Sequence, residues 1–171
     1  VLEFKSAIRE DATIYDAYEQ LNVRYIRDIP ELFIYNTFTI ISDGVNSKAG
    51  TVFTDYSNYY SWNKAEATDP PSDGINSLRT LMDGMFRKDR LLEIIRDFIY
   101  FPNDSGKNEK ILCRYPQFFA ATLLLNNIRR HMKPDGDGKG GTYFGTTGCG
   151  KSYTMLFLAR LLMKSKDMRN P

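Results

Sequence analysis

Residues Gly145–Ser152 read GTTGCGKS and fit the pattern G-x-x-x-x-G-K-[ST] of a phosphate-binding loop. The glycines let the backbone curl so that successive N–H groups point at phosphate oxygens. We expect the lysine ammonium to reach the β- and γ-phosphates of a nucleotide and the serine hydroxyl to ligate Mg²⁺. By residue frequencies alone, the pattern arises in roughly one chain of this length in two hundred. The candidate nucleotide-binding residues are Gly145, Thr146, Thr147, Gly148, Cys149, Gly150, Lys151 and Ser152.

The residues around this loop predict a strand before it and a helix after it. Thr142–Phe144 is a short apolar run that suits a strand, and Ser152–Lys164 is a mostly apolar segment of helical length. Such a helix directs the positive end of its dipole at the same anion. Nucleotide hydrolysis also needs an acidic residue on a later strand, and Asp167 is the only acid after the loop. We therefore expect the domain to continue beyond Pro171.

A glutamine upstream of the loop suggests how a base could be read. Gln117 lies in the segment RYPQFFA, at the start of a predicted helix over Tyr115–Met132 that is entered through Pro116. A carboxamide can bond both the donor and the acceptor edge of adenine, and a nearby aromatic ring can stack on the base. The segment resembles the adenine-reading Q motif of superfamily-two helicases, which would favour ATP over GTP. A solvated or helix-capping glutamine is the alternative.

The chain opens on an alternating stretch, VLEFK, which suits a β-strand. On a strand, Glu3 and Lys5 share one face, while Leu2 and Phe4 point to the other. A carboxylate beside an ammonium can hold Mg²⁺ and assist the attacking water in phosphodiester hydrolysis. The triplet E-x-K arises by chance in about half of chains this long, so an exposed ion pair is the alternative.

The sequence between these two ends predicts a mixture of helices and strands. Periodic apolar residues after a cap at Asp11 or Thr13 predict a helix to about Ile26. The run Thr68–Gly74 (TDPPSDG) reads as a linker. We further expect strands at Leu32–Ser42 and Gly50–Thr54 around a turn at Asp43–Gly44, helices within Ile75–Tyr100 that break at Gly84, and a loop at Asn103–Lys110.

The composition is that of a globular protein that can bury a core. The 171 residues are 42% hydrophobic and 26% charged, and the net charge of +2 gives no global basic field that would announce nucleic acid. The two cysteines, Cys113 and Cys149, match no zinc or disulfide spacing. Apolar runs are too short to cross a bilayer. We expect a cytoplasmic protein without a membrane partner.

Taken in order, these segments resemble the restriction (R, motor) subunit of type I restriction enzymes. LEFKSA resembles the second half of the PD-(D/E)xK nuclease signature, and GGTYFGTTGCGKSYTMLFLARLL resembles helicase motif I with its flanks. DAYEQLNVRYIRDIPELFIYNTFTIISDG, KDRLLEIIRDFIYF and RYPQFFAA resemble the segments between them. The resemblance implies an α/β fold: an α+β nuclease remnant with a small mixed sheet at 1–68, a linker and helical connector at 69–110, and the start of a P-loop RecA-like domain at 111–171.

The resemblance also implies roles for single residues. Glu3 would be a Mg²⁺ ligand and Lys5 the catalytic lysine of DNA cleavage, with an Asp before Val1 as the second metal ligand. Gln117 would read adenine, and Ser152 would serve the Mg²⁺ of ATP. The implied cofactors are ATP and Mg²⁺, and the implied partners are double-stranded DNA and the methyltransferase (M) and specificity (S) subunits. A helicase-like ATPase without active nuclease and a subunit-docking segment stay open as alternatives.

The sequence departs from this family at one spacing. The family carries Q-x-x-x-Y on the helix after E-x-K, whereas here Gln20 is followed by Tyr25, one residue too far. On a regular α-helix, residues five apart sit roughly 140° from each other. We therefore expect that the two side chains do not face one site. Gln20 is kept as a candidate for orienting DNA or the site, and Tyr25 is assigned to the core.

Overall fold

The computed structural model of the chain describes residues 1–6, 13–102 and 109–168. These residues form both helices and strands, which confirms the coarse α/β expectation. The chain divides into two compact units, Val1–Arg114 and Tyr115–Pro171. This division sets one boundary only, after Arg114. The expected boundary at 68/69 is crossed by contacts such as the hydrogen bond between the Ser47 and Ser77 hydroxyls, at 3.0 Å. The three-part domain division stays a prediction.

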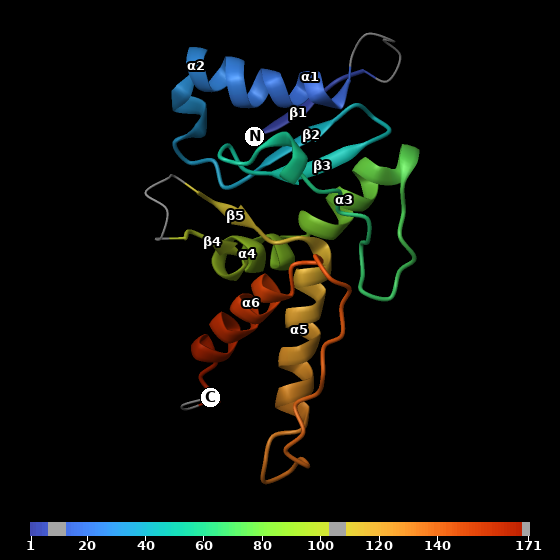
Figure 1. Cartoon of the computed structure of the whole chain (residues 1–171), viewed down its shortest axis with the longest axis vertical. Coiled ribbons are helices and arrows are strands. Elements are labelled where there is room, and N and C mark those ends of the chain that lie inside the picture. Colours follow the sequence, from blue (N-terminus) through green and yellow to red (C-terminus); the bar gives the residue numbers. More distant parts are fainter. Residues whose placement is uncertain (7–12, 103–108, 169–171) are drawn as a thin grey trace. The chain divides into compact units, whose positions relative to one another are not determined.

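The first unit is built on a three-stranded mixed sheet (Figure 1). Its strands, in sheet order, are β1 (Leu2–Phe4), β2 (Thr39–Ser42) and β3 (Ser47–Gly50). β1 runs parallel to β2, and β2 runs antiparallel to β3. The expectation of a short strand at the start of the chain, on a small mixed sheet, is therefore confirmed.

The turn at Asp43–Gly44 is confirmed, but both strands beside it are placed differently from the prediction. The Asp43 carboxylate accepts hydrogen bonds from the backbone N–H of Val45 and Asn46, at 2.9 and 2.6 Å. This closes the turn early, so that β3 ends at Gly50, where the returning strand was expected to begin. The strand before the turn begins only at Thr39. Pro30 starts a 3-10 helix, η2 (Pro30–Phe33), over the residues where that strand was expected to start.

The first helix begins where the sequence predicts. The Thr13 hydroxyl accepts a hydrogen bond from the Asp16 N–H at 3.3 Å, and the Asp16 carboxylate accepts from the Thr13 N–H at 2.6 Å. This reciprocal capping box confirms Thr13 as the cap, while Asp11 lies outside the described residues. The helical segment runs in three parts, α1 (Ile14–Glu19), a π-helix η1 (Gln20–Tyr25) and α2 (Ile26–Asp28).

Helices cover both faces of the sheet (Figure 1). Ile14, Ala17 and Leu21 on the first helix pack against Ile41 of β2, and all four are at least nine-tenths buried. Ile40, the neighbour of Ile41 on β2, points to the opposite face because successive strand residues alternate. On that side lie α3 (Ser77–Met85) and α4 (Lys88–Asp97), and short 3-10 turns η3 (Tyr56–Asn58) and η4 (Gly74–Asn76) complete the connections.

Gly84 does not break a helix, which corrects the sequence-based prediction. It lies inside α3, and the interruption falls after Met85, before α4 begins at Lys88. A Cβ at Gly84 would stand 2.3 Å from the indole Nε1 of Trp62, which is 2% exposed. The glycine is therefore explained by the close approach of the buried indole to the helix backbone.

Replacing Gly84 with alanine is expected to lower the free energy of unfolding by about 1–3 kcal/mol, because the added methyl overpacks the contact with Trp62. Asp83→Ala is the matched control, since Asp83 is exposed in the same turn of α3. Its effect should stay within about 0.5 kcal/mol. Denaturant unfolding of both variants measures the difference. Equal unfolding midpoints for the two variants would show that the indole does not fix this position.

The remaining elements include a hairpin in the first unit and two helices in the second. Within Ile75–Tyr100, the helical segment ends at Asp97, and a strand pair follows. Part of the expected loop at Asn103–Lys110, residues 103–108, lies outside the described residues. The elements are β4 (Ile99–Tyr100), β5 (Ile111–Leu112), α5 (Tyr115–Arg130) and α6 (Lys151–Lys164).

The second unit confirms its two predicted helices and corrects its predicted strand. α5 and α6 lie within a residue or two of the expected bounds. Thr142–Phe144 forms no strand in the part of the chain that the structure describes. A strand exists only through hydrogen bonds to a neighbour, and here no described strand pairs with this segment. Phe144 accordingly stays 91% exposed.

Candidate functional site

The register of β1 decides which of its side chains meet the first helix. Glu3 pairs with Ile41 of β2 in the parallel ladder, so its side chain points to the same face as Ile41. Ile41 packs under the first helix, and Lys5 shares the face of Glu3 because it lies two residues on. Leu2 and Phe4 point the other way and are 41% and 52% exposed. The predicted division of the strand into two faces is confirmed.

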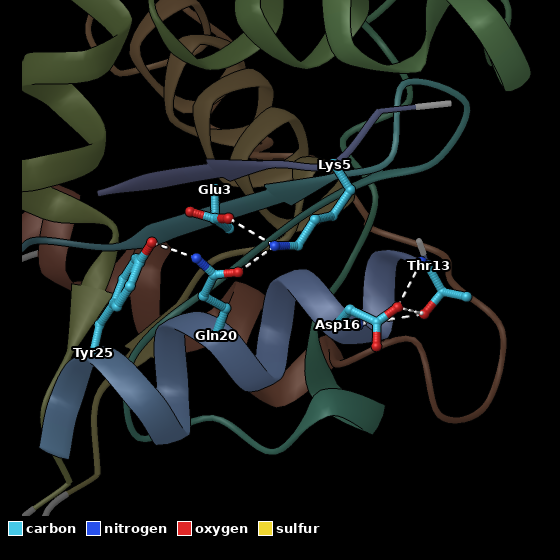
Figure 2. Close-up of polar contacts among 6 residues, drawn as sticks. All are labelled: Glu3, Lys5, Thr13, Asp16, Gln20 and Tyr25. Atoms are coloured by element: carbon cyan, nitrogen blue, oxygen red, sulfur yellow. Dashed lines mark hydrogen bonds and ion pairs between the residues drawn. The ribbon is translucent and has the colours of Figure 1, made fainter. Parts of the chain in front are cut away.

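Three polar side chains meet between β1 and the π-helix (Figure 2). The Lys5 ammonium donates a hydrogen bond to Glu3 Oε1 at 3.0 Å and another to Gln20 Oε1. The Lys5 and Glu3 side chains are 19% and 15% exposed, so the pair is largely shielded from solvent. An ion pair at this depth is less screened by water and salt than a surface pair. The pair is therefore not the exposed ion pair that the sequence left open.

Tyr25 joins this cluster, which corrects the expectation that it faces away from Gln20. The Gln20 carboxamide nitrogen donates a hydrogen bond to the Tyr25 hydroxyl. The expectation assumed a regular helix, but residues Gln20–Tyr25 form a π-helix, in which backbone bonds join residues five apart. Side chains five apart therefore lie on one face. The Tyr25 ring still packs against the buried core cluster, so the assignment to the core holds for the ring only.

Asp16 is a further charged group near the cluster that sequence reasoning missed (Figure 2). Hydrogen bonds from the Thr13 backbone and hydroxyl hold the pKa of Asp16 below its usual range, with smaller contributions from the charges of Lys5 and Arg24. The sequence spacing could have indicated this, because Asp16 precedes Gln20 by four residues, and residues four apart share one face of an α-helix. Its carboxylate completes the capping box with Thr13, which fixes where α1 begins, and hence where Gln20 lies.

The phosphate-loop candidate lies in the second unit, ahead of α6. Gly148 and Gly150 both have φ of 81°, a left-handed conformation that strongly favours glycine. The Lys151 ammonium donates to the carbonyls of Gly145 and Thr146, at 3.0 and 2.8 Å. The residues of the loop and first helical turn that are exposed are Thr146, Thr147, Gly148, Lys151 and Ser152, while Gly145, Cys149 and Gly150 are half-buried.

Gln117 lies against this loop rather than in solvent. Its side chain extends from the first turn of α5 and is 2% exposed, and its Nε2 donates to the carbonyl of Gly150 at 3.4 Å. A Cβ on Gly150 would stand 2.3 Å from the same nitrogen, so a glycine is required for this approach as well as for its backbone conformation. The structure thus brings the glutamine and the glycine-rich loop together in one unit.

Within the described ranges, no group of three or more His, Cys, Asp or Glu side chains could hold a metal ion by itself. The candidate metal-binding groups are therefore single side chains, Glu3 in the first unit and Ser152 in the second. No helix among the described residues combines the length and the apolar character that a membrane crossing requires.

No protein-family model matches the chain. The chain is 31% identical, over all of its length, to the type I restriction enzyme HindI endonuclease subunit of Haemophilus influenzae. It is 28% identical over 100% of its length, and 26% identical over 98%, to two Methanocaldococcus jannaschii proteins named for the endonuclease subunits of type I restriction enzymes MjaIXP and MjaVIIIP. It spans 16%, 18% and 16% of the lengths of these three relatives.

Proposed function

We propose, from the homology of this chain over its whole length to endonuclease subunits of type I restriction enzymes, that it carries part of a DNA-cleavage site and an ATP-binding loop. The first unit would be the back of a PD-(D/E)xK nuclease domain with its connector, and the second the start of a RecA-like motor domain. In the assembled enzyme, ATP hydrolysis would drive translocation of duplex DNA, and the nuclease would then cut both strands. The proposed partners are M and S subunits.

The observation that supports the nuclease half is the cluster of Glu3, Lys5 and Gln20 on a strand and a helix that pack together. Mg²⁺ prefers hard oxygen ligands and is commonly bound by one or two carboxylates with several waters, so the Glu3 carboxylate fits it. We propose that a second carboxylate completes the metal site. Bound Mg²⁺ would polarise the phosphodiester and lower the pKa of an attacking water.

Lys5 would contribute a fixed positive charge to this chemistry. Its ammonium is held by Glu3 Oε1 at 3.0 Å and by Gln20 Oε1, so it is oriented before substrate arrives. Negative charge develops on the phosphate oxygens during cleavage, and a pre-oriented cation in a shielded site stabilises that charge more than a mobile one. Glu3 would bind the metal, Lys5 would stabilise the transition state, and Gln20 would orient Lys5.

The observation that supports the ATP half is the contact between Gln117 and the glycine-rich loop. The loop backbone and the N-terminus of α6 would receive the phosphates. Lys151 would exchange its bonds to two loop carbonyls for bonds to phosphate oxygens, and the Ser152 hydroxyl would ligate the Mg²⁺ of ATP. Gln117, held at the edge of the loop, would read the adenine edge.

Cleavage of unmodified DNA by the assembled enzyme is expected to require both ATP and Mg²⁺. Omission of ATP, or its replacement by GTP, should abolish cleavage, because no nucleotide that fits the site is then present. Chelation of the metal should also abolish cleavage, because it removes the Lewis acid. Gel analysis of linearised plasmid measures the result. Methylated plasmid of the same sequence is the control. Cutting without nucleotide would contradict the coupling of motor and nuclease, and equal cutting with GTP would contradict adenine reading by Gln117.

A further inference from the structure

The thiol of Cys149 lies against the inner side of the glycine-rich loop. A Cβ on Gly145 would stand 2.8 Å from the Cys149 sulfur and 3.2 Å from the Tyr143 hydroxyl oxygen. The sulfur therefore packs directly against the backbone where the loop begins. An atom added to the sulfur on this side would have to displace that backbone.

Two hydroxyl groups from neighbouring segments gather at this sulfur. The Tyr143 hydroxyl lies within hydrogen-bonding reach of Cys149 and Thr154. Burial raises the pKa of Tyr143, and the neighbouring Cys149 raises it further, so the hydroxyl keeps its proton and can donate. Thr154, on the first turn of α6, is 1% exposed, and its Oγ1 meets no hydrogen-bond partner of good geometry in the described part of the chain.

A buried hydroxyl without a partner loses its bonds to water and gains nothing in return, which costs free energy. The thiol does not satisfy Thr154, because sulfur is only a weak acceptor. An oxygen atom attached to the sulfur would be a stronger acceptor. The surroundings of Cys149 therefore have an unused donor for one further oxygen.

The two cysteines of the chain differ in their surroundings. Cys113 is 3% exposed, and burial, together with the charge of Glu93, raises the pKa of its thiol. A buried thiol that holds its proton is inert, since the deprotonated form is the reactive one. Cys149 is only half-buried. Cys113 is therefore an internal control for the reactivity of Cys149.

We propose that Cys149 is a modification site at which a peroxide adds one oxygen to the sulfur, and that the resulting sulfenic acid closes the loop to nucleotide. The hydroxyls of Tyr143 and Thr154 donate to the added oxygen. This inference rests on the proposed ATP-binding function and concerns the regulation of that same site.

The chemical step is a two-electron oxidation of the sulfur. The deprotonated thiol attacks one oxygen of hydrogen peroxide, the S–O bond forms as the O–O bond breaks, and the departing hydroxide leaves as water with the thiol proton. A small thiol reverses the step. Its first molecule forms a mixed disulfide and releases the added oxygen as water, and its second molecule frees Cys149 and leaves as the small disulfide.

The added oxygen opposes nucleotide binding in two ways. The sulfur already contacts Gly145, so the loop backbone has to move to make room. In its anionic form, the oxidised group also repels the phosphates of the nucleotide. The N-terminus of α6 favours negative charge at this place, so it stabilises the oxidised group at the expense of the phosphates.

The first test locates the oxygen directly. The assembled enzyme is treated with hydrogen peroxide, and sulfenic acid is trapped with dimedone for mass spectrometry of the peptides. The label is expected on Cys149 and not on Cys113. In a parallel sample without dimedone, ATP hydrolysis is expected to fall by about tenfold or more, since a misplacement of roughly 1 Å can cost about a hundredfold. Dithiothreitol should restore it.

Either of two results from this test would contradict the inference. Absence of the label from Cys149 would overturn the modification site. A labelled Cys149 with unchanged ATP hydrolysis would overturn the closing of the loop.

The second test asks whether the loss of activity comes from this sulfur. The rate of ATP hydrolysis after peroxide is divided by the rate before peroxide for each enzyme separately. The ratio is expected to fall about tenfold for the unaltered enzyme and to stay near one for Cys149→Ser. An equal fall in both enzymes would place the damage at other residues and would overturn the inference.

The third test removes the hydroxyl that has no partner. Thr154→Val is expected to slow the labelling of Cys149 by about fivefold, which is the worth of one hydrogen bond. Thr122→Val is the matched control, because Thr122 lies on α5 and its buried Oγ1 likewise meets no partner among the described residues. If both variants are labelled at the same rate, the role given to Thr154 is wrong.

Lys151→Ala separates this inference from the proposed function. If Lys151→Ala loses ATP hydrolysis but peroxide leaves Cys149 of the unaltered enzyme unlabelled, the nucleotide site stands and the modification site is wrong. If Lys151→Ala hydrolyses ATP normally while Cys149 takes the label, the proposed nucleotide site is wrong and the modification site stands without its effect on nucleotide.

Discussion

Cleavage of DNA by the assembled enzyme is expected to fall by about a hundred- to a thousandfold when Lys5 is replaced with alanine. The ammonium is the only cation hydrogen-bonded to Glu3 among the described residues, and it is 19% exposed. Its loss removes the charge that would stabilise the phosphate oxygens as negative charge develops. The loss also leaves the Glu3 carboxylate without its partner in a shielded site.

The measurement is single-turnover cleavage of unmodified plasmid at saturating ATP and Mg²⁺. Lys88→Ala is the matched control, because it removes an exposed lysine from α4 of the same unit. The control should cleave at the rate of the unaltered enzyme. Undiminished cutting by the Lys5 variant would favour the alternative of a motor without an active nuclease at this site.

Lys151→Ala is expected to lower ATP hydrolysis by about a hundredfold or more, and cleavage with it. The lysine is exposed, and its described hydrogen bonds go only to the carbonyls of Gly145 and Thr146, so its removal should not disturb the fold. Without the ammonium, the β- and γ-phosphates lose the charge that holds them over the loop. Phosphate release in the presence of unmodified DNA measures the effect.

Lys166→Ala is the control for this second variant, because Lys166 is an exposed lysine just after α6. It should hydrolyse ATP at the unaltered rate. A Lys151 variant that keeps its restriction activity would contradict the nucleotide assignment, and would instead favour a segment whose role is to dock partner subunits.

Local sequence signals predicted the parts of the fold that depend on nearby residues. The alternation around Glu3 and Lys5 gave both faces of β1, because strand geometry repeats every two residues. Thr13, one of the two expected caps, marked the start of α1, because a capping side chain bonds to backbone N–H groups within the first turn of its own helix. The bounds of α5 and α6 followed from their apolar periodicity and flanking breakers.

Features that depend on tertiary contacts were not predicted. The glycine at position 84 was read as a break, although its reason is the indole of Trp62, far away in the sequence. The π-helix was missed because a periodicity argument assumes 3.6 residues per turn from the outset. The strand predicted at Thr142–Phe144 has the right composition, but a strand is defined by a neighbour that composition does not supply.

The central claim is that two phosphate chemistries reside in this chain, one at Glu3 and Lys5 and the other at Lys151, and that each uses its own residues. The most direct test is the rate of DNA-dependent ATP hydrolysis by the Lys5→Ala enzyme, measured on the same preparation whose cleavage has been lost. The account predicts a rate equal to that of the unaltered enzyme. Loss of ATP hydrolysis together with cleavage, in a variant that melts normally, would contradict it.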